Sequence, residues 1–213
     1  LICGGDKDGT QVELAKISRG ANRIPVSIDR IPQHVRDAFV YIEDERFYEH
    51  AGVDWKRTFG AFLNELTHGM LYGSKQGGST ITQQLVKNVT GDKEQNMDRK
   101  MREIFRAADL EKYRTKDEIL DAYLNCVGMG GSCSGVQAAA LKYFGKDVSE
   151  LDLAEAACLA AIPKSPESLN PFANKEANRE RQLLVLKAMY NNAAISKQQY
   201  DDAVNEELQF RDP

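Results

Sequence analysis

Apolar residues recur at helical spacing over most of the chain. From Ile31-Pro32 onward, proline fits a first helical turn, and Val35, Phe39 and Ile42 follow three or four residues apart. Three further helix starts carry capping-box sequences, namely Thr115-Lys-Asp-Glu118, Asp152-Leu-Ala-Glu155 and Ser196-Lys-Gln-Gln199. The pattern therefore predicts a mainly α fold, with one domain over residues 31–213.

The first 30 residues follow a different pattern. Asp8-Gly9 is a turn signal, and the apolar positions after it, such as Val12 and Leu14, are too loosely spaced for a helix. We expect residues 1–30 to form an extended lead-in segment with a short strand or two.

Two glycine-rich segments interrupt the helical pattern, at residues 72–80 and 128–135. Glycine lets the main chain approach a ligand closely, and the serine and threonine residues beside it supply uncharged donors and acceptors. We expect function to lie near these loops.

Composition narrows the class of protein. The 213 residues are 42% hydrophobic and 28% charged, as in soluble globular domains, and are enough for one sizeable core. A net charge of −4 gives no reason to expect nucleic acid as a partner. No run in these 213 residues reaches the roughly 18–20 apolar residues of a membrane-spanning helix, and none has the basic start and apolar middle typical of a signal peptide.

The four cysteines, at positions 3, 126, 133 and 158, do not form a zinc-binding pattern. Only Cys126 and Cys133, on either side of a glycine loop, are close enough in sequence to suggest a disulfide. A disulfide and a pair of buried thiols are both compatible with this spacing.

The first candidate for chemistry is a run of acids ending at His50. Glu43 falls at four-residue spacing between Phe39 and Phe47, on or beside a face expected to be buried. Desolvation raises the pKa of a carboxyl group, as a general base working near neutral pH requires. The alternative is a surface ion pair of Glu43 and its neighbour Asp44 with arginine.

The second candidate is the segment 77–88, in which a glycine pair leads into a run of hydroxyl and amide side chains. A helix starting here would offer free N–H groups to a phosphate or a sugar, and Lys87 would add positive charge. A glycine turn followed by a threonine-capped helix is the plainer interpretation.

The third candidate is Arg99-Lys-Met-Arg-Glu103, on a helix whose apolar side carries Met97, Met101, Phe105 and Ala108. The polar side can be a surface row of ion pairs, which stabilises little. Alternatively it can be a clamp that neutralises a departing diphosphate, directly or through a divalent cation.

Taken together, four separated motifs resemble glycosyltransferase family 51, the peptidoglycan glycosyltransferases of class A penicillin-binding proteins and monofunctional enzymes. They are Glu-Asp-x-x-Phe-x-x-His-x-Gly at 43–52, Gly-Gly-Ser-Thr-Ile-Thr-Gln-Gln at 77–84, Arg-Lys-x-x-Glu at 99–103 and Lys-x-x-Ile-Leu-x-x-Tyr-Leu-Asn at 116–125. The likeness continues to about Pro171 and so covers nearly the whole chain.

The resemblance implies a lysozyme-like helical fold with a larger head lobe and a small membrane-facing jaw lobe at roughly 55–76. It also implies polymerisation of lipid II into β-1,4-linked glycan, with inversion and release of undecaprenyl diphosphate. The expected location is the extracytoplasmic face of the bacterial cytoplasmic membrane, with an N-terminal transmembrane anchor upstream of these residues. Expected partners are lipid II, the nascent glycan strand, the membrane surface, cell-wall synthesis proteins and a C-terminal transpeptidase domain, and no nucleic acid.

Carried over by motif, Glu43 is the catalytic base and Glu103 the second catalytic acid. The residues expected to bind substrate are Asp44, Phe47, His50, Ser79, Thr82, Gln83, Gln84, Lys87, Asn88, Arg99 and Lys100. No cofactor is obligatory, and Mg²⁺ or Mn²⁺ near Glu103 is the metal alternative that the resemblance leaves open. The helical spacing of the apolar positions from Trp55 to Tyr72 is compatible with a core helix or with a helix that lies in the membrane surface, and the resemblance favours lipid contact.

Two positions depart from the family pattern. Gln95 stands where the family often has an arginine directed toward the diphosphate, and the segment after Asn125 has cysteines and glycines in place of an aromatic and glycine run. A lysozyme-like hydrolase and a non-catalytic scaffold are the alternative functions. The polar second motif and the basic third motif argue against the hydrolase, because cleavage of a neutral glycosidic bond needs no diphosphate clamp.

Overall fold

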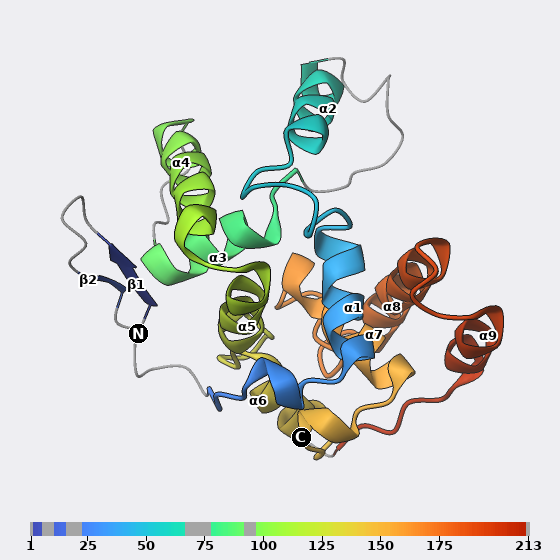
Figure 1. Ribbon diagram of the computed structural model, residues 1–213. Helices are drawn as coiled ribbons and strands as arrows, with labels where there is room; N and C mark the ends of the chain where they lie inside the picture. Colours follow the sequence, from blue (N-terminus) through green and yellow to red (C-terminus); the bar gives the residue numbers. More distant parts are fainter. Residues whose placement is uncertain (1, 6–10, 16–22, 67–77, 92–96, 212–213) are drawn as a thin grey trace. The chain divides into compact units, whose positions relative to one another are not determined.

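The computed structural model describes residues 2–5, 11–15, 23–66, 78–91 and 97–211 (Figure 1). The chain divides into two compact units, one made of Leu1–Ile17 with Arg46–Ile119 and the other of Ser18–Glu45 with Leu120–Pro213. The predicted mainly α fold is confirmed: apart from one pair of strands, the described residues form helices, turns and loops. The predicted boundary at residue 30 and the limits of the jaw lobe stay predictions.

The first unit contains two strands and three complete helices among its described residues. The strands β1 (Ile2–Gly5) and β2 (Gln11–Ala15) pair antiparallel, as expected for a short extended lead-in. The helices are α2 (Trp55–Leu66), α3 (Ile81–Thr90) and α4 (Met97–Tyr113), and α5 (Lys116–Cys126) begins in this unit. Helix α3 packs against α4.

Gly52, the last residue of the first motif, allows the backbone there to pack closely against α4. Its φ of +79° lies in the left-handed region, and a Cβ at this position would come within 2.5 Å of the carbonyl oxygen of Ala107. The carbonyl of Gly52 accepts a hydrogen bond of 2.6 Å from the hydroxyl of Thr80. Thr80 also forms a capping box with Gln83 at the start of α3. The end of the first motif and the second motif are thus joined inside this unit through Gly52 and Thr80.

The second unit is built around a helix of small apolar residues, α7 (Leu153–Ala161). Helices α1 (Gln33–Glu43) and α8 (Lys175–Asn191) both pack against α7 and against each other (Figure 1). Nearly every residue of α7 is buried, as expected of a helix that is apolar on all sides. The remaining helices are α6 (Val136–Tyr143), α9 (Lys197–Asn205) and the 3₁₀ turns η1 (Ile28–Arg30), η2 (Val148–Glu150) and η3 (Ile162–Lys164).

The predicted capping boxes are confirmed. Asp152 with Glu155 opens α7, and Ser196 with Gln199 opens α9. At the start of α5 the amide of Thr115 donates to Glu118, whose own amide donates to the hydroxyl of Thr115. Each box satisfies backbone N–H groups that a helix start otherwise leaves without partners.

The glycine loop between α5 and α6 is held without a disulfide. Within the described residues Cys126 and Cys133 are buried thiols, which settles the alternative left open by their spacing. The loop is closed by backbone hydrogen bonds, including Gly135 N–H to Val127 C=O at 2.8 Å, and the hydroxyl of Tyr143 donates to the carbonyl of Met129 at 2.6 Å. Among the described residues no helix is long and apolar enough to cross a bilayer.

Candidate active site

Glu43 is the last residue of α1 and is buried, with 9% of its surface exposed. The oxygen Oε1 of Glu43 lies 3.4 Å from Nη2 of Arg181 on α8, and their side chains are only 11% and 14% exposed. A buried carboxylate is expensive unless a cation or several donors compensate its charge. The predicted burial of Glu43 is confirmed, and the surface ion-pair alternative is wrong for this residue.

Tyr123 of the fourth motif belongs to the same surroundings. Its side chain is fully buried. Burial raises the pKa of Tyr123 well above its ordinary value, and its neighbours Glu43, Cys126 and Asp44 raise it further. The phenol therefore stays protonated at neutral pH. Asp44, which ends α1, is fully buried as well.

Phe47 and His50 lie in the other unit, in the loop before α2. Phe47 is fully buried, and its ring meets the rings of Tyr48 and His50 edge-on, with centroids 5.0 and 6.3 Å away. The ammonium of Lys116 lies 4.4 Å from the centroid of the Phe47 ring. These contacts give Phe47 a packing role, and its predicted contact with substrate stays a prediction.

The second motif divides into inward-facing and outward-facing side chains. Thr82 and Gln83 are fully buried, and the hydroxyl of Thr82 donates to Glu111 at 2.5 Å. Lys87 and Asn88 are exposed on α3, and Gln84 is half-buried. Ser79, just before the helix, accepts a hydrogen bond of 2.8 Å from Lys100. Ser79, a predicted substrate residue of this motif, is thus brought to a cation of α4.

The third motif forms a compact charged cluster on α4. Glu103 is buried, with 5% of its surface exposed, and its Oε2 accepts from Nη1 of Arg99 at 2.7 Å. Lys100 donates both to the other oxygen of Glu103 and to Ser79. Two cationic side chains thus flank one buried carboxylate. Such a cluster suits an anionic group with several oxygens.

A divalent cation fits this cluster poorly. Both oxygens of Glu103 already accept from cationic side chains, so a metal ion would have to displace Arg99 or Lys100. The described residues contain no group of three or more histidine, cysteine, aspartate or glutamate side chains that could hold a metal.

Helix α4 buries a face that contains a charged residue and exposes its apolar face, whereas helices of globular proteins usually bury the apolar face. Glu103 and Ala107 are buried, whereas Met97, Met101 and Phe105 are exposed over 76%, 47% and 67% of their surfaces. The alternative of a surface ion-pair row is therefore wrong for Arg99 and Glu103. On α2, Trp55 and Phe59 are likewise exposed, over 64% and 62%. The side chains beyond residue 60 in the predicted lipid-contacting stretch, and Gln95, lie outside the described residues.

Arg181 is the functional candidate that the sequence reasoning missed. It lies four residues before Val185 and eight before Met189, and both of these are fully buried. Glu43 stands in the same relation to Phe39 and Val35 on α1. A charged residue in line with an apolar stripe was therefore the available signal on both helices.

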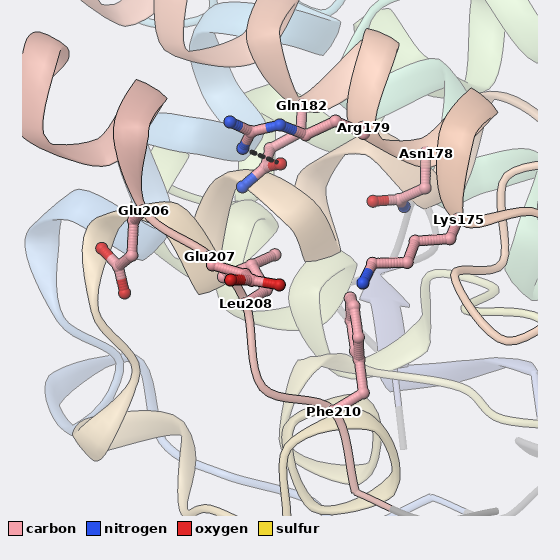
Figure 2. A pocket seen from close by; sticks show the side chains of 8 residues that line it. All are labelled: Lys175, Asn178, Arg179, Gln182, Glu206, Glu207, Leu208 and Phe210. Atoms are coloured by element: carbon pink, nitrogen blue, oxygen red, sulfur yellow. Dashed lines mark hydrogen bonds between the residues drawn. The ribbon is translucent and has the colours of Figure 1, made fainter.

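A cavity of about 280 Å³ lies elsewhere in the second unit, between α8 and the segment after α9 (Figure 2). Arg179 donates to Gln182 at 2.7 Å and to the carbonyl of Val204, as Figure 2 shows for the first of these bonds. Gln182 in turn donates to the carbonyl of Ala154 at 2.7 Å. These polar groups tie the end of α9 to α8, and α8 to the start of α7. The side chains that line the cavity are Lys175, Asn178, Arg179, Gln182, Glu206, Glu207, Leu208 and Phe210.

Comparison with known proteins places these features in a family. The family described as transglycosylase matches residues 10–190. Penicillin-binding protein 1A of Clostridium perfringens strain 13 is 46% identical over 193 residues, which are 86% of this chain and 28% of that protein. Penicillin-binding protein 1A of Aquifex aeolicus is 45% identical over 186 residues, which are 87% of this chain and 25% of that protein.

A solved structure agrees with these relatives. The crystal structure of penicillin-binding protein 1A from Haemophilus influenzae is similar with a TM-score of 0.52 and 25% identity, over 96% of this chain and 20% of that one. The chain thus spans about a quarter of the length of the curated relatives it matches. Since the family match covers most of the chain and includes all four motifs, the chain belongs to the transglycosylase family, glycosyltransferase family 51.

Proposed function

We propose that this chain is a peptidoglycan glycosyltransferase that polymerises lipid II into β-1,4-linked glycan strands during cell-wall synthesis. The observation that carries the proposal is the buried carboxylate of Glu43, which lies 3.4 Å from the half-buried guanidinium of Arg181. An anionic carboxylate protected from bulk water is the group that a proton abstraction needs. Membership in the transglycosylase family supports the choice of reaction.

In this proposal Glu43 accepts the proton of the 4-hydroxyl of the acceptor lipid II. The hydroxyl oxygen attacks the anomeric muramyl carbon of the growing strand, and the bond from that carbon to the diphosphate oxygen breaks. The bond electrons leave with undecaprenyl diphosphate, and the new β-1,4 linkage has inverted configuration. Proton transfer and bond formation are favoured when the reacting groups are held in place before the reaction.

The departing diphosphate gains negative charge as its bond to carbon breaks. Arg99 and Lys100 are the cations that we assign to it, with the hydroxyl of Ser79 as an additional donor. Glu103 holds both cations in a fixed position through its two oxygens. A role for Mg²⁺ or Mn²⁺ is not needed for this charge neutralisation.

We further propose that the protein works at the extracytoplasmic face of the cytoplasmic membrane, where it meets its lipid-linked substrate. The exposed rings of Trp55 and Phe59 on α2 are suited to the boundary between head groups and acyl chains. An N-terminal membrane anchor and a C-terminal transpeptidase domain are parts of this proposal, in line with relatives about four times as long.

The test is incubation of the 213-residue chain with labelled lipid II, with and without a chelator, followed by sizing of the product. We expect glycan polymers and released undecaprenyl diphosphate in both conditions, and no polymer from Glu43→Gln. Moenomycin, which mimics the donor strand in this family, should compete with lipid II. Cleavage of finished peptidoglycan without polymerisation would instead identify a hydrolase, and inactivity of a folded wild-type chain would overturn the proposal.

A further inference from the structure

Two helices of the second unit each carry one charged residue in line with their apolar contact face. On α1 the buried stripe of Val35 and Phe39 continues into Glu43, and on α8 the buried stripe of Met189 and Val185 continues back to Arg181. Since α1 and α8 pack against each other, the two charges come together at the edge of their shared contact face. The pair is thus built into the packing of the helices.

The contact is looser than an ion pair that only stabilises a fold. Nη2 of Arg181 lies 3.4 Å from Oε1 of Glu43, whereas charge-assisted hydrogen bonds are typically about 2.7–2.9 Å long. Arg46 and Asp54 provide the comparison within this chain, with three hydrogen bonds of 2.7–2.9 Å. In addition, Nε of Arg181 is buried and has no hydrogen-bond partner among the described residues.

The charges around Glu43 make a nearby cation necessary. Asp44 at the end of α1 is fully buried, and Tyr123 from α5 is too. Helix α7 also packs against α1, but its titratable groups are engaged elsewhere: Glu155 with Lys146 at 2.6 Å and Cys158 with Asn178 at 3.0 Å. Arg181 is the cationic side chain of α8 that lies within ion-pair distance of Glu43.

We propose that Arg181 is a positioning residue of the glycosyltransferase reaction, which keeps the buried Glu43 ionised and aims its carboxylate until a proton is transferred to it. The inference rests on the proposed function, in which Glu43 is the base. When Glu43 takes the proton, its charge disappears and the attraction to Arg181 weakens. A loose pair of 3.4 Å is compatible with this change, because little bonding is lost when Glu43 becomes neutral.

The inference predicts a pH effect with a definite sign. Without the guanidinium, the buried Glu43 carboxylate is harder to keep ionised, because burial disfavours charge and an opposite charge within reach favours it. The rate of lipid II polymerisation falls on the acidic side of its pH profile, and in Arg181→Gln this fall should occur at a pH higher by about one unit or more. Initial rates of lipid II polymerisation near pH 6 should fall roughly 10-fold or more and recover partly as the pH rises.

Arg181→Lys and Arg179→Gln are the matched variants. Lysine keeps the positive charge but lacks the planar set of N–H donors of the guanidinium. The acidic side of the pH profile should therefore stay in place while kcat falls. Arg179 lies on the same helix two residues away and bonds to Gln182 and Val204 instead of Glu43. Arg179→Gln loses comparable packing, so it should leave the acidic limb at the wild-type position. Measuring kcat and KM for lipid II between pH 5 and 9 separates these expectations.

A double variant, Glu43→Gln with Arg181→Gln, tests the inference even if Arg181→Gln alone does not fold. If the single variant unfolds because Glu43 is left as a buried charge without its cation, then Glu43→Gln with Arg181→Gln should regain the thermal stability of Glu43→Gln alone. A double variant that stays unfolded would overturn the inference. So would an active Arg181→Gln whose acidic limb coincides with that of Arg179→Gln. A folded wild-type chain that polymerises no lipid II would instead refute the proposed function itself.

Discussion

Buried carboxylates in this chain are compensated in two different ways. Asp54 is fixed by short bonds from Arg46 and by the amide of Arg57 at 3.0 Å, at the start of α2. Glu43 has a longer contact of 3.4 Å to Arg181. The first arrangement is suited to holding a helix start in place, and the second to a group that must change its charge.

Asp54 should make the stability of the chain depend on pH. Burial opposes its ionisation, but the hydrogen bonds from Arg57 and Arg46 outweigh burial and lower the pKa of Asp54 below its ordinary value of 3.8. Its contribution is therefore complete above the unfolded pKa and is lost as the pH falls through the folded pKa. We expect Asp54→Asn to lower the free energy of unfolding at pH 7 and to approach the wild type as the pH falls through the folded pKa of Asp54.

Urea unfolding at pH 7 and at pH 3 measures this difference. Asp109→Asn is the control, since Asp109 is exposed and pairs only loosely with Lys112 at 3.2 Å. An Asp54→Asn variant with the same deficit at both pH values would contradict the assignment.

Glu103 should matter through the cations that it holds. A glutamine at this position keeps one oxygen acceptor but turns its amide donors toward Lys100 or Arg99, so one of the two cations is released. We expect Glu103→Gln to lower kcat/KM for lipid II roughly 100-fold, the scale seen when one group that stabilises a developing charge is lost. Glu118→Gln, which alters the exposed pair with Arg114, should stay close to wild type in the same initial-rate assay. Equal rates for both variants would show that Glu103 does not act on the donor site.

At the scale of elements, the packing of the first motif on α4 depends on Gly52. An alanine there must adopt a positive φ and bring its Cβ to 2.5 Å from the carbonyl oxygen of Ala107. Gly91, which ends α3, has a similar φ of +62° but no atom within 4 Å of the Cβ position. We expect Gly91→Ala to cost about 1 kcal/mol and Gly52→Ala about 3 kcal/mol or more, measured by denaturant unfolding. Equal costs would mean that the loop can move away from α4.

Helix starts were the elements most open to prediction from sequence. A capping box places its signal within four consecutive residues, so Asp152 with Glu155 and Ser196 with Gln199 could be recognised without the fold. The orientation of α4 could not be predicted in this way. Its hydrophobic spacing defines an apolar stripe, but only the neighbouring helix and loop determine that Glu103 and Ala107, instead of Met101 and Phe105, face inward. The spacing of apolar residues identifies the apolar face of a helix but does not show which face packs against the rest of the protein.

Pairs across the fold were beyond the sequence reasoning for the same reason. Glu43 could be selected because it interrupts the stripe of Phe39, and Arg181 interrupts the stripe of Val185 in the same manner. Joining these two residues, 138 positions apart, requires knowing that α1 and α8 are neighbours around α7. The candidate base was thus predictable, and the residue that compensates its charge was not.

At the scale of the whole molecule, the proposed membrane contact can be tested by replacing exposed apolar side chains. Trp55 and Phe59 lie four residues apart on α2, so they share one face of the helix, and more than half of each side chain is exposed. Because exposed side chains contribute little to the core, Trp55→Ser with Phe59→Ser should leave thermal unfolding nearly unchanged. The same double variant should weaken binding to vesicles of anionic phospholipid roughly 10-fold or more, since two large apolar groups no longer insert.

Leu184 supplies the matched control for this prediction. It is a large apolar residue with 58% exposure on α8, in the other unit, and single exposed apolar residues are common on protein surfaces without binding anything. Vesicle co-sedimentation should therefore give wild-type binding for Leu184→Ser and reduced binding for the α2 variant. Polymerisation of detergent-solubilised lipid II should be less affected than polymerisation in vesicles, because detergent brings the substrate to the protein without a membrane surface. Equal vesicle binding by all three proteins would remove α2 from the membrane contact and leave the exposed face of Met97, Met101 and Phe105 on α4 as the surface to test.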